Sequence, residues 1–74
     1  MAKLPAISGK ELVRILERCG FLMQRQTGSH VLLEHSDGRV VVIPVHANKD
    51  LPKGTLRGIL RDVEITPDQL RELM

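Results

Sequence analysis

The chain has 74 residues and a mass of 8.3 kDa, which leaves room for one small domain and excludes large enzyme folds such as a Rossmann domain or a TIM barrel. Hydrophobic residues make up 42% of the chain and charged residues 27%, as in ordinary globular domains, so wholesale disorder is not expected. We therefore expect a single folded domain over residues 1–74.

The formal net charge of +2 hides an uneven distribution of charge. Residues 1–61 carry ten Lys and Arg against five Asp and Glu, whereas residues 62–74 carry one against four. The basic part favours a polyanionic partner, and the acidic end is not expected to contact it. Phe21 is the only aromatic residue besides histidine, so the base-stacking platforms of common RNA-binding modules are missing and contacts with phosphate are favoured.

Cys19 is the only cysteine, which excludes an internal disulfide and any zinc site with two thiolates. No stretch approaches the roughly 20 apolar residues of a membrane span, and the first residues lack the apolar run of a secretory signal. We expect a cytoplasmic protein that does not associate with membranes.

The first predicted element is a helix over residues 9–19. Ser8 and Glu11 have the spacing of a capping box, and Gly20 stands where a left-handed C-terminal cap is expected. The apolar stripe of this helix consists of Leu12, Ile15, Leu16 and Cys19. Its other side carries Lys10, Arg14 and Arg18, which we expect to be solvated.

Three strands are predicted next, over residues 21–26, 31–35 and 39–45. Thr27-Gly28-Ser29 predicts a turn between the first two, and Ser36-Asp37-Gly38 predicts a tight hairpin between the second and third. The strands therefore form an antiparallel meander, with Pro44 at the end of the third strand or on an edge because it lacks a backbone donor.

Two further helices follow a polar loop at residues 47–51. Pro52 opens the first of them, and its buried stripe is Leu56, Ile59, Leu60 and Val63. Gly54 and Gly58 each weaken that helix by about 1 kcal/mol relative to Ala, which indicates either a close backbone approach on their face or a cost that the helix tolerates. Thr66-Pro67-Asp68-Gln69 predicts a short helix over residues 67–74. The expected fold class is α+β, with two helices on one face of a three-stranded antiparallel sheet and the other face open.

Basic side chains recur along the second predicted helix. Lys53, Arg57 and Arg61 are four residues apart, and Lys49 lies just ahead of them. This spacing places the charged groups along one side of the helix, beside its apolar face. Phosphate binding and a solvated edge both remain open interpretations.

Three histidines are the only side chains whose ordinary pKa lies near neutrality: His30, His35 and His46. His30 follows the Gly28-Ser29 turn, which lets its side chain project, and His46 ends the third strand beside the polar loop. We expect His35 to face solvent beside the hairpin turn. No metal site is expected, because His30 and His35 leave opposite faces of a strand and no cysteine partner is close. Catalysis, ligand binding and a structural role all remain open for His30.

Five blocks of the chain, between about residues 5 and 62, resemble in order and spacing the HicA (YcfA-like) toxin family. They are Ser8-Gly9-Lys10-Glu11-Leu12, Gly20-Phe21, Gly28-Ser29-His30, Val42-Ile43-Pro44-Val45-His46, and residues 53–60 with the sequence KGTLRGIL. The resemblance implies a fold like that of a double-stranded-RNA-binding domain. It also implies a metal-independent ribonuclease without a cofactor, which cuts mRNA, arrests growth and is blocked by a HicB-like antitoxin protein.

The resemblance also implies roles for individual residues. His30 matches the catalytic histidine of the family, Gly28 and Ser29 match the turn that presents it, and His46 matches a supporting histidine. RNA cleavage without a metal needs proton transfer and charge stabilisation at the scissile phosphate, so we expect His30 to move a proton. The phosphates would be held by Lys49, Lys53, Arg57 and Arg61. We expect the antitoxin to cover His30.

Two other interpretations remain beside the ribonuclease. The domain could be a non-catalytic RNA-binding module of the same fold, with His30 as a contact to phosphate or a 2′-hydroxyl. It could also be a nucleic-acid-binding partner that works only with an antitoxin bound.

Overall fold

The structure, a computed structural model, describes residues 4–46 and 49–74. Its elements, in chain order, are helix α1 (Gly9–Arg18), strands β1 (Phe21–Thr27), β2 (His30–His35) and β3 (Val40–Pro44), and helices α2 (Lys53–Val63) and α3 (Pro67–Leu73). This order confirms the predicted α+β class, and each boundary that was predicted lies within one residue of the observed one. No helix in the described part of the chain is both long enough and apolar enough to cross a membrane.

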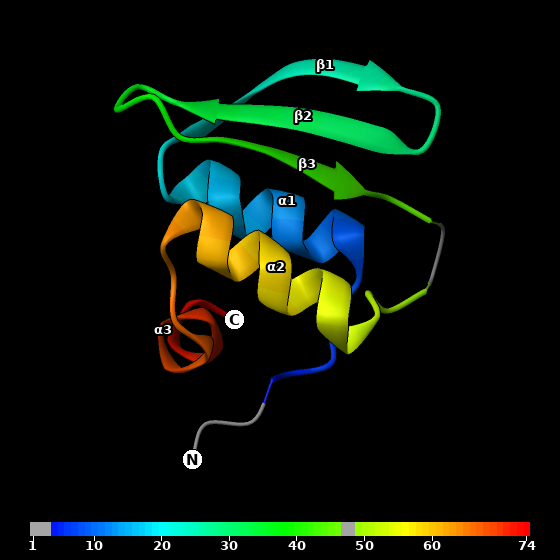
Figure 1. The fold of residues 1–74 in the computed structure, drawn as a ribbon, viewed down its shortest axis with the longest axis vertical. Coiled ribbons are helices and arrows are strands. Elements are labelled where there is room, and N and C mark those ends of the chain that lie inside the picture. The colour runs from blue at the N-terminus through cyan, green and yellow to red at the C-terminus, as the bar shows by residue number, and fades with distance from the viewer. Residues whose placement is uncertain (1–3, 47–48) are drawn as a thin grey trace.

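The three strands form one antiparallel sheet in the order β1-β2-β3. Both long helices lie on the same side of this sheet, and no helix of the described residues covers the opposite side (Figure 1). The pairing of β1 with β2 shifts between Met23 and Arg25, where a bulge interrupts the register. Pro44 is the last residue of the edge strand β3, as predicted.

The core lies between the sheet and the helices. Along β2, Val31 and Leu33 are buried toward the helices, whereas the intervening residues lie on the uncovered face. The predicted stripes of both long helices are buried except for the half-buried Cys19. The fully buried side chains are Ile7, Leu12, Leu16, Phe21, Leu33, Ile43, Leu56, Val63 and Leu70.

Side-chain caps fix the first turns of α1 and α3. The backbone N–H of Glu11 donates to the Ser8 hydroxyl at 3.2 Å, and Glu11 accepts from the Ser8 backbone in return. Thr66 and Gln69 form the same reciprocal pair at the start of α3. Both predicted capping boxes are therefore confirmed. The N-cap of α2 is Pro52, which provides no side-chain cap.

A glycine does allow a close approach between elements, but it is not one of those predicted. A Cβ placed on Gly54 or Gly58 would meet no atom within 4 Å, so the expected approach on that face of α2 is wrong. On Gly9, in contrast, a Cβ would lie 2.1 Å from the backbone oxygen of Pro44. The first turn of α1 is thus packed directly against the end of β3.

Candidate active site

A two-residue turn presents His30 at the start of β2. Thr27 and His30 are paired across this turn, and Gly28 has a φ of 55°. A positive φ at the first turn position and a negative φ at the second match the type II′ turn, which favours glycine at the first position. Ser29 is half-buried and His30 is exposed. The turn therefore directs the chain so that the His30 side chain reaches solvent.

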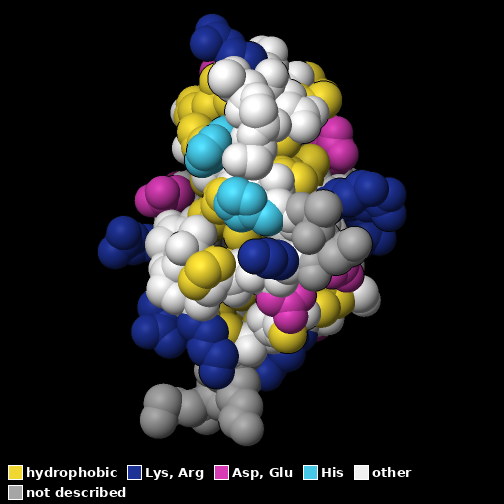
Figure 2. Space-filling model, turned by 90° about the vertical axis from the view of Figure 1, so that its right-hand side faces the viewer, with side chains coloured by type: hydrophobic (Ala, Val, Ile, Leu, Met, Phe, Trp, Pro, Cys, Tyr) yellow, Lys and Arg dark blue, Asp and Glu magenta, His cyan; other side chains and the backbone are white. Residues whose placement is uncertain are grey.

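A single backbone hydrogen bond brings His46 to the same end of the sheet. The Val45 N–H donates to the Ser29 carbonyl at 2.5 Å, which extends the β2–β3 ladder one residue beyond Pro44. His46 is the next residue, and its side chain is exposed. Histidine side chains gather on the face of the molecule shown in Figure 2, with a basic side chain beside them.

The end of the sheet that carries His30 and His46 is called the histidine end. The residues that lead into α2 lie beside it. The Lys49 N–H donates to the His46 carbonyl at 3.2 Å, and the Leu51 N–H donates to the Ile7 carbonyl at 2.8 Å. Lys49 therefore follows His46 closely, and α2 starts a few residues later with Lys53. Both lysine side chains are exposed. Residues 47 and 48, which belong to the predicted loop, lie outside the residues that the structure describes.

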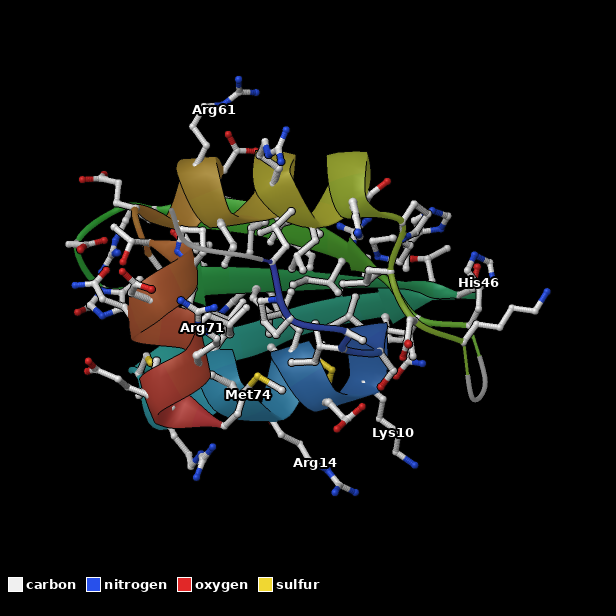
Figure 3. All side chains as sticks on the ribbon, turned by 90° about the horizontal axis from the view of Figure 1, so that it is seen from below. Lys10, Arg14, His46, Arg61, Arg71 and Met74 are labelled. Carbon is white, nitrogen blue, oxygen red and sulfur yellow. The ribbon has the colours of Figure 1, made fainter. Side chains whose placement is uncertain are left out.

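The basic side chains of α2 are spread along the helix. A rise of 1.5 Å per residue places Arg61 about 12 Å along the axis from Lys53. Arg61 points outward from α2, far from His46 at the other end of the molecule (Figure 3). The structure thus groups His30, His46 and Lys49 at one end, with Lys53 next along the chain, and leaves Arg61 away from them.

His30 has the properties of a group that is free to react. Within residues 4–46 and 49–74, its side chain makes no hydrogen bond and no ion pair, and it is exposed. An imidazole in this position can accept a proton on one nitrogen and deliver one from the other. No group of three or more His, Cys, Asp or Glu that could hold a metal ion occurs among the described residues.

His35 lies at the other end of β2, and the prediction that it faces solvent is wrong. Its side chain is only 20% exposed, and its Nδ1 accepts the backbone N–H of Asp37 at 3.1 Å. Its ring meets that of Phe21 edge-on, with 5.0 Å between the ring centroids. The reason is parity: His35 continues the alternation of Val31 and Leu33 and so points toward the helix side of the sheet.

Arg39 holds this far end together, a role that the sequence analysis did not assign. Its Nη1 donates to the Val63 carbonyl at 2.5 Å, its Nε donates to Asp37 Oδ2 at 2.8 Å, and its guanidinium lies 5.2 Å from the Phe21 ring centroid. The Arg39 backbone N–H, followed by the guanidinium, lowers the pKa of Asp37 below its ordinary value of 3.8. The sequence signal was Asp37 two residues before Arg39, the spacing of an Asx turn.

The comparison with protein families gives a match. The family described as the HicA toxin of bacterial toxin-antitoxin systems matches residues 9–65, which is well over half of the chain. The chain belongs to the HicA toxin family. It is therefore a toxin of a toxin-antitoxin system, and an antitoxin is its partner. The matched region of this HicA chain contains both exposed histidines and the start of α2. Comparison with curated proteins gave no match.

Proposed function

We propose that this HicA toxin is a metal-independent endoribonuclease that cleaves mRNA, and that His30 transfers a proton in the reaction. The observation that supports this most strongly is the exposed imidazole of His30, presented by the Gly28-Ser29 turn. Backbone hydrogen bonds bring the segment of His46 and Lys49 to the same end of the sheet, so a second titratable group and a cation are available there. Cleavage of mRNA explains how such a small protein acts as a toxin.

The proposed reaction needs three events at one phosphate of the RNA. The 2′-hydroxyl loses its proton, its oxygen attacks the adjacent phosphorus, and the bond from phosphorus to the 5′-oxygen breaks as that oxygen gains a proton. The products are a 2′,3′-cyclic phosphate and a free 5′-hydroxyl. His30 moves one of the two protons, which commonly contributes a factor of about 100 to 10,000 in rate. His46 supports the reaction from the adjoining segment.

Positive charge would stabilise the phosphate during this reaction. Lys49 and Lys53 follow His46 in the chain, and Arg57 and Arg61 extend the basic side of α2. The first turn of α2 contains no acidic residue and has no side-chain cap, unlike the first turn of α1. Backbone N–H groups and lysines at such a position favour an anion. We therefore propose that RNA phosphates lie along this helix, with the scissile one near Lys49.

The test incubates the purified toxin with single-stranded RNA in the presence of EDTA. We expect the wild-type protein to cleave the RNA in chelator and to leave 2′,3′-cyclic phosphate ends, and His30→Ala to lose at least 100-fold in rate. Met74→Ala, at an exposed apolar position on the C-terminal end, is the control and should cleave normally. Tight binding of RNA that remains intact would instead indicate a non-catalytic RNA-binding module.

A further inference from the structure

A groove lies between helix α1 and strand β1, on the side of the sheet that carries the helices. Its volume is about 860 Å³, within the range of about 300–1,000 Å³ that is typical of small-molecule sites. The apolar side chains that line it are Val13, Met23, Val31 and Val45. The groove therefore has the size and part of the lining of a ligand site, and it is separate from the uncovered face of the sheet.

The second half of β1 is exposed on this side of the sheet. Met23 pairs with Leu33 and Gln26 pairs with Val31, and paired residues share a face of a sheet. Leu33 and Val31 are buried, which places this face toward the helices. Met23 is nevertheless 50% exposed, and Gln26 is exposed as well. Two side chains on the helix side of β1 thus face the groove and not the core.

The bulge in β1 determines which side chain enters the groove. Regular alternation from Met23 would place Arg25 on the helix side and Gln26 on the opposite face. The shift of register reverses this, because Arg25 pairs with Leu32 on the uncovered face and Gln26 pairs with the buried Val31. Bulges commonly re-aim a side chain in this way next to a functional site. The groove therefore receives a neutral amide in place of a guanidinium.

The charges around the groove do not favour a phosphate. Among the residues that the structure describes, the carboxylates that line it outnumber the cations: Glu11, Glu17 and Asp50 against Lys10 and Arg14. A phosphate would be repelled there, whereas a neutral ring with hydrogen-bonding groups would not. Within the described ranges, the side chains of Glu17, Gln26 and Asp50 form no hydrogen bond or ion pair. Two carboxylates and one amide are thus available to a neutral ligand.

We propose that this groove binds the base of a nucleotide next to the scissile phosphate, and that it selects adenine over uracil. The inference rests on the proposed ribonuclease function and names its base selection. The apolar side chains contact the ring, for which the thioether of Met23 is a favourable neighbour. The Gln26 amide donates and accepts, which matches the amino group and ring nitrogen of adenine. The carboxylates accept from an amino group and repel the carbonyl oxygens of uracil.

The groove adjoins the histidine end, so one RNA strand can occupy both. The Gln26–Val31 pair lies next to the pair that contains His30, and neighbouring residues on a strand are about 3.4 Å apart. Asp50, which also lines the groove, directly follows Lys49 in the chain. The RNA would run along α2 and cross the histidine end, and the base beyond the scissile phosphate would enter the groove.

The test measures binding of two short RNAs, one made of adenines and one of uracils, with every 2′-hydroxyl methylated. Methylation removes the attacking group, so the full-length toxin can bind these RNAs without cutting them. We expect the wild type to bind the adenine RNA about tenfold more tightly, as a well-matched pair of hydrogen bonds provides. Gln26→Ala should lower this ratio to about twofold or less. Fluorescence anisotropy measures the four affinities.

Two neighbouring residues of β1 give matched controls. Gln24→Ala removes the same side chain from a position outside the groove lining and should keep the wild-type ratio. Met23→Ser removes apolar surface from the groove and should weaken binding of the adenine RNA about fivefold. Leu22→Ser removes a side chain that is 67% exposed on the opposite face and should leave that affinity unchanged. Urea unfolding shows that each variant is folded.

Three outcomes would overturn the proposal. One is that the wild type binds the two RNAs equally or prefers uracil. Another is that Gln26→Ala keeps the wild-type ratio. The third is that Gln26→Ala and Met23→Ser lose affinity for the purified antitoxin while their affinity for RNA is intact, because the groove would then be a site for protein.

Because the methylated RNAs cannot be cleaved, this proposal and the ribonuclease proposal can fail separately. If binding selects adenine through Gln26 but the toxin leaves unmodified RNA intact, the catalytic role of His30 is refuted and the groove is the base site of an RNA-binding module. If the toxin cleaves unmodified RNA but its base selection does not depend on Gln26, the groove proposal alone is refuted.

Discussion

The two ends of β2 each carry a histidine, and the surroundings of the two side chains are opposite. His30 is exposed and, within the described residues, makes no side-chain hydrogen bond. His35 packs against Phe21, accepts a hydrogen bond from the Asp37 backbone and lies beside the ion pair of Asp37 with Arg39. Five positions separate them, an odd number, so they leave opposite faces of the same strand.

This difference distinguishes the histidine that we propose as catalytic from a structural one. A general acid or base must exchange protons with a substrate, so at least one ring nitrogen must be accessible and free of a fixed partner. Nδ1 of His35 already has such a partner, and its Nε2 faces Gly20, where a Cβ would lie only 2.9 Å away. The end of the sheet with the turn at residues 36–38 is therefore held by fixed contacts, and the end with the Gly28-Ser29 turn leaves its histidine accessible.

The largest effect should come from replacing the histidine at each end of β2 by alanine and comparing the two variants. His30→Ala should lower the rate of RNA cleavage by about 100 to 10,000-fold and should change the free energy of unfolding by less than about 0.5 kcal/mol, because the side chain is exposed and has no partner among the described residues. Cleavage assays and urea unfolding of the same preparation measure both. If His30→Ala lowered the free energy of unfolding enough to account for the lost activity, the distinction between the two histidines would be removed.

His35→Ala should give the reverse result. It removes a hydrogen bond and an aromatic contact, so we expect a loss of about 1–3 kcal/mol in the free energy of unfolding. The folded fraction should still cleave RNA at the wild-type rate, because the side chain lies at the other end of the sheet. His46→Ala is the matched control for stability, since that side chain is exposed. Unaltered stability in His35→Ala would show that its contacts contribute little.

Much of the fold followed from local patterns in the sequence. The capping boxes at Ser8 and Thr66, the turn at Gly28 and the stripes of both long helices depend on residues close together in the chain, and all appear as predicted except that Cys19 is half-buried. The surroundings of His35 did not follow, because they depend on contacts between separate elements. Its place near the turn suggested solvent, whereas the parity of the strand and the packing of Phe21 decided otherwise.

In the candidate site, too, the features set by local sequence could be predicted, and those set by contacts between distant segments could not. Sequence reasoning selected His30 and the turn before it, because a turn followed by a strand is a local pattern. The hydrogen bond that joins Val45 to Ser29 connects segments far apart in the chain, and only the structure shows that it brings His46 to the same end. The contact of Gly9 with Pro44 is also non-local, and a glycine after an N-cap gave no sign of it.

That glycine contact supplies the next test, because it shows how the end of β3 near His30 is held against α1. Gly9→Ala would push a methyl group into the backbone of β3, so we expect a destabilisation of about 1–3 kcal/mol. Gly58→Ala adds the same methyl group within α2, where there is open space, and should stabilise the protein by up to about 1 kcal/mol. Thermal or urea unfolding separates the two variants by sign. Equal effects would mean that α1 shifts easily away from Pro44.

A smaller effect is expected from the cations of α2 that would bind RNA phosphates near His30. Replacing both Lys53 and Arg57 by Ala should weaken the binding of single-stranded RNA and flatten the slope of log affinity against log salt by about 1.4, since each lost phosphate contact contributes about 0.7. Lys10→Ala with Arg14→Ala removes the same charges from α1 and should leave the slope unchanged. If the α1 pair flattened the slope instead, the RNA would lie on the first helix.

The smallest expected effect lies at the structural end and depends on pH. The pKa of Asp37 is lowered in the folded protein by hydrogen bonds from Arg39, so ionised Asp37 stabilises the fold at any pH above its ordinary value of 3.8, and this contribution disappears as the pH falls through the lowered pKa. Asp37→Asn should therefore lower the melting temperature slightly at pH 7, and the gap to the wild type should close in strong acid. The Asp37→Asn variant should cleave RNA at the same rate as the wild type, because Asp37 and His30 lie at opposite ends of β2. A gap that persisted unchanged well below pH 3.8 would show that the difference in stability does not come from the charge of the carboxylate that contacts Arg39.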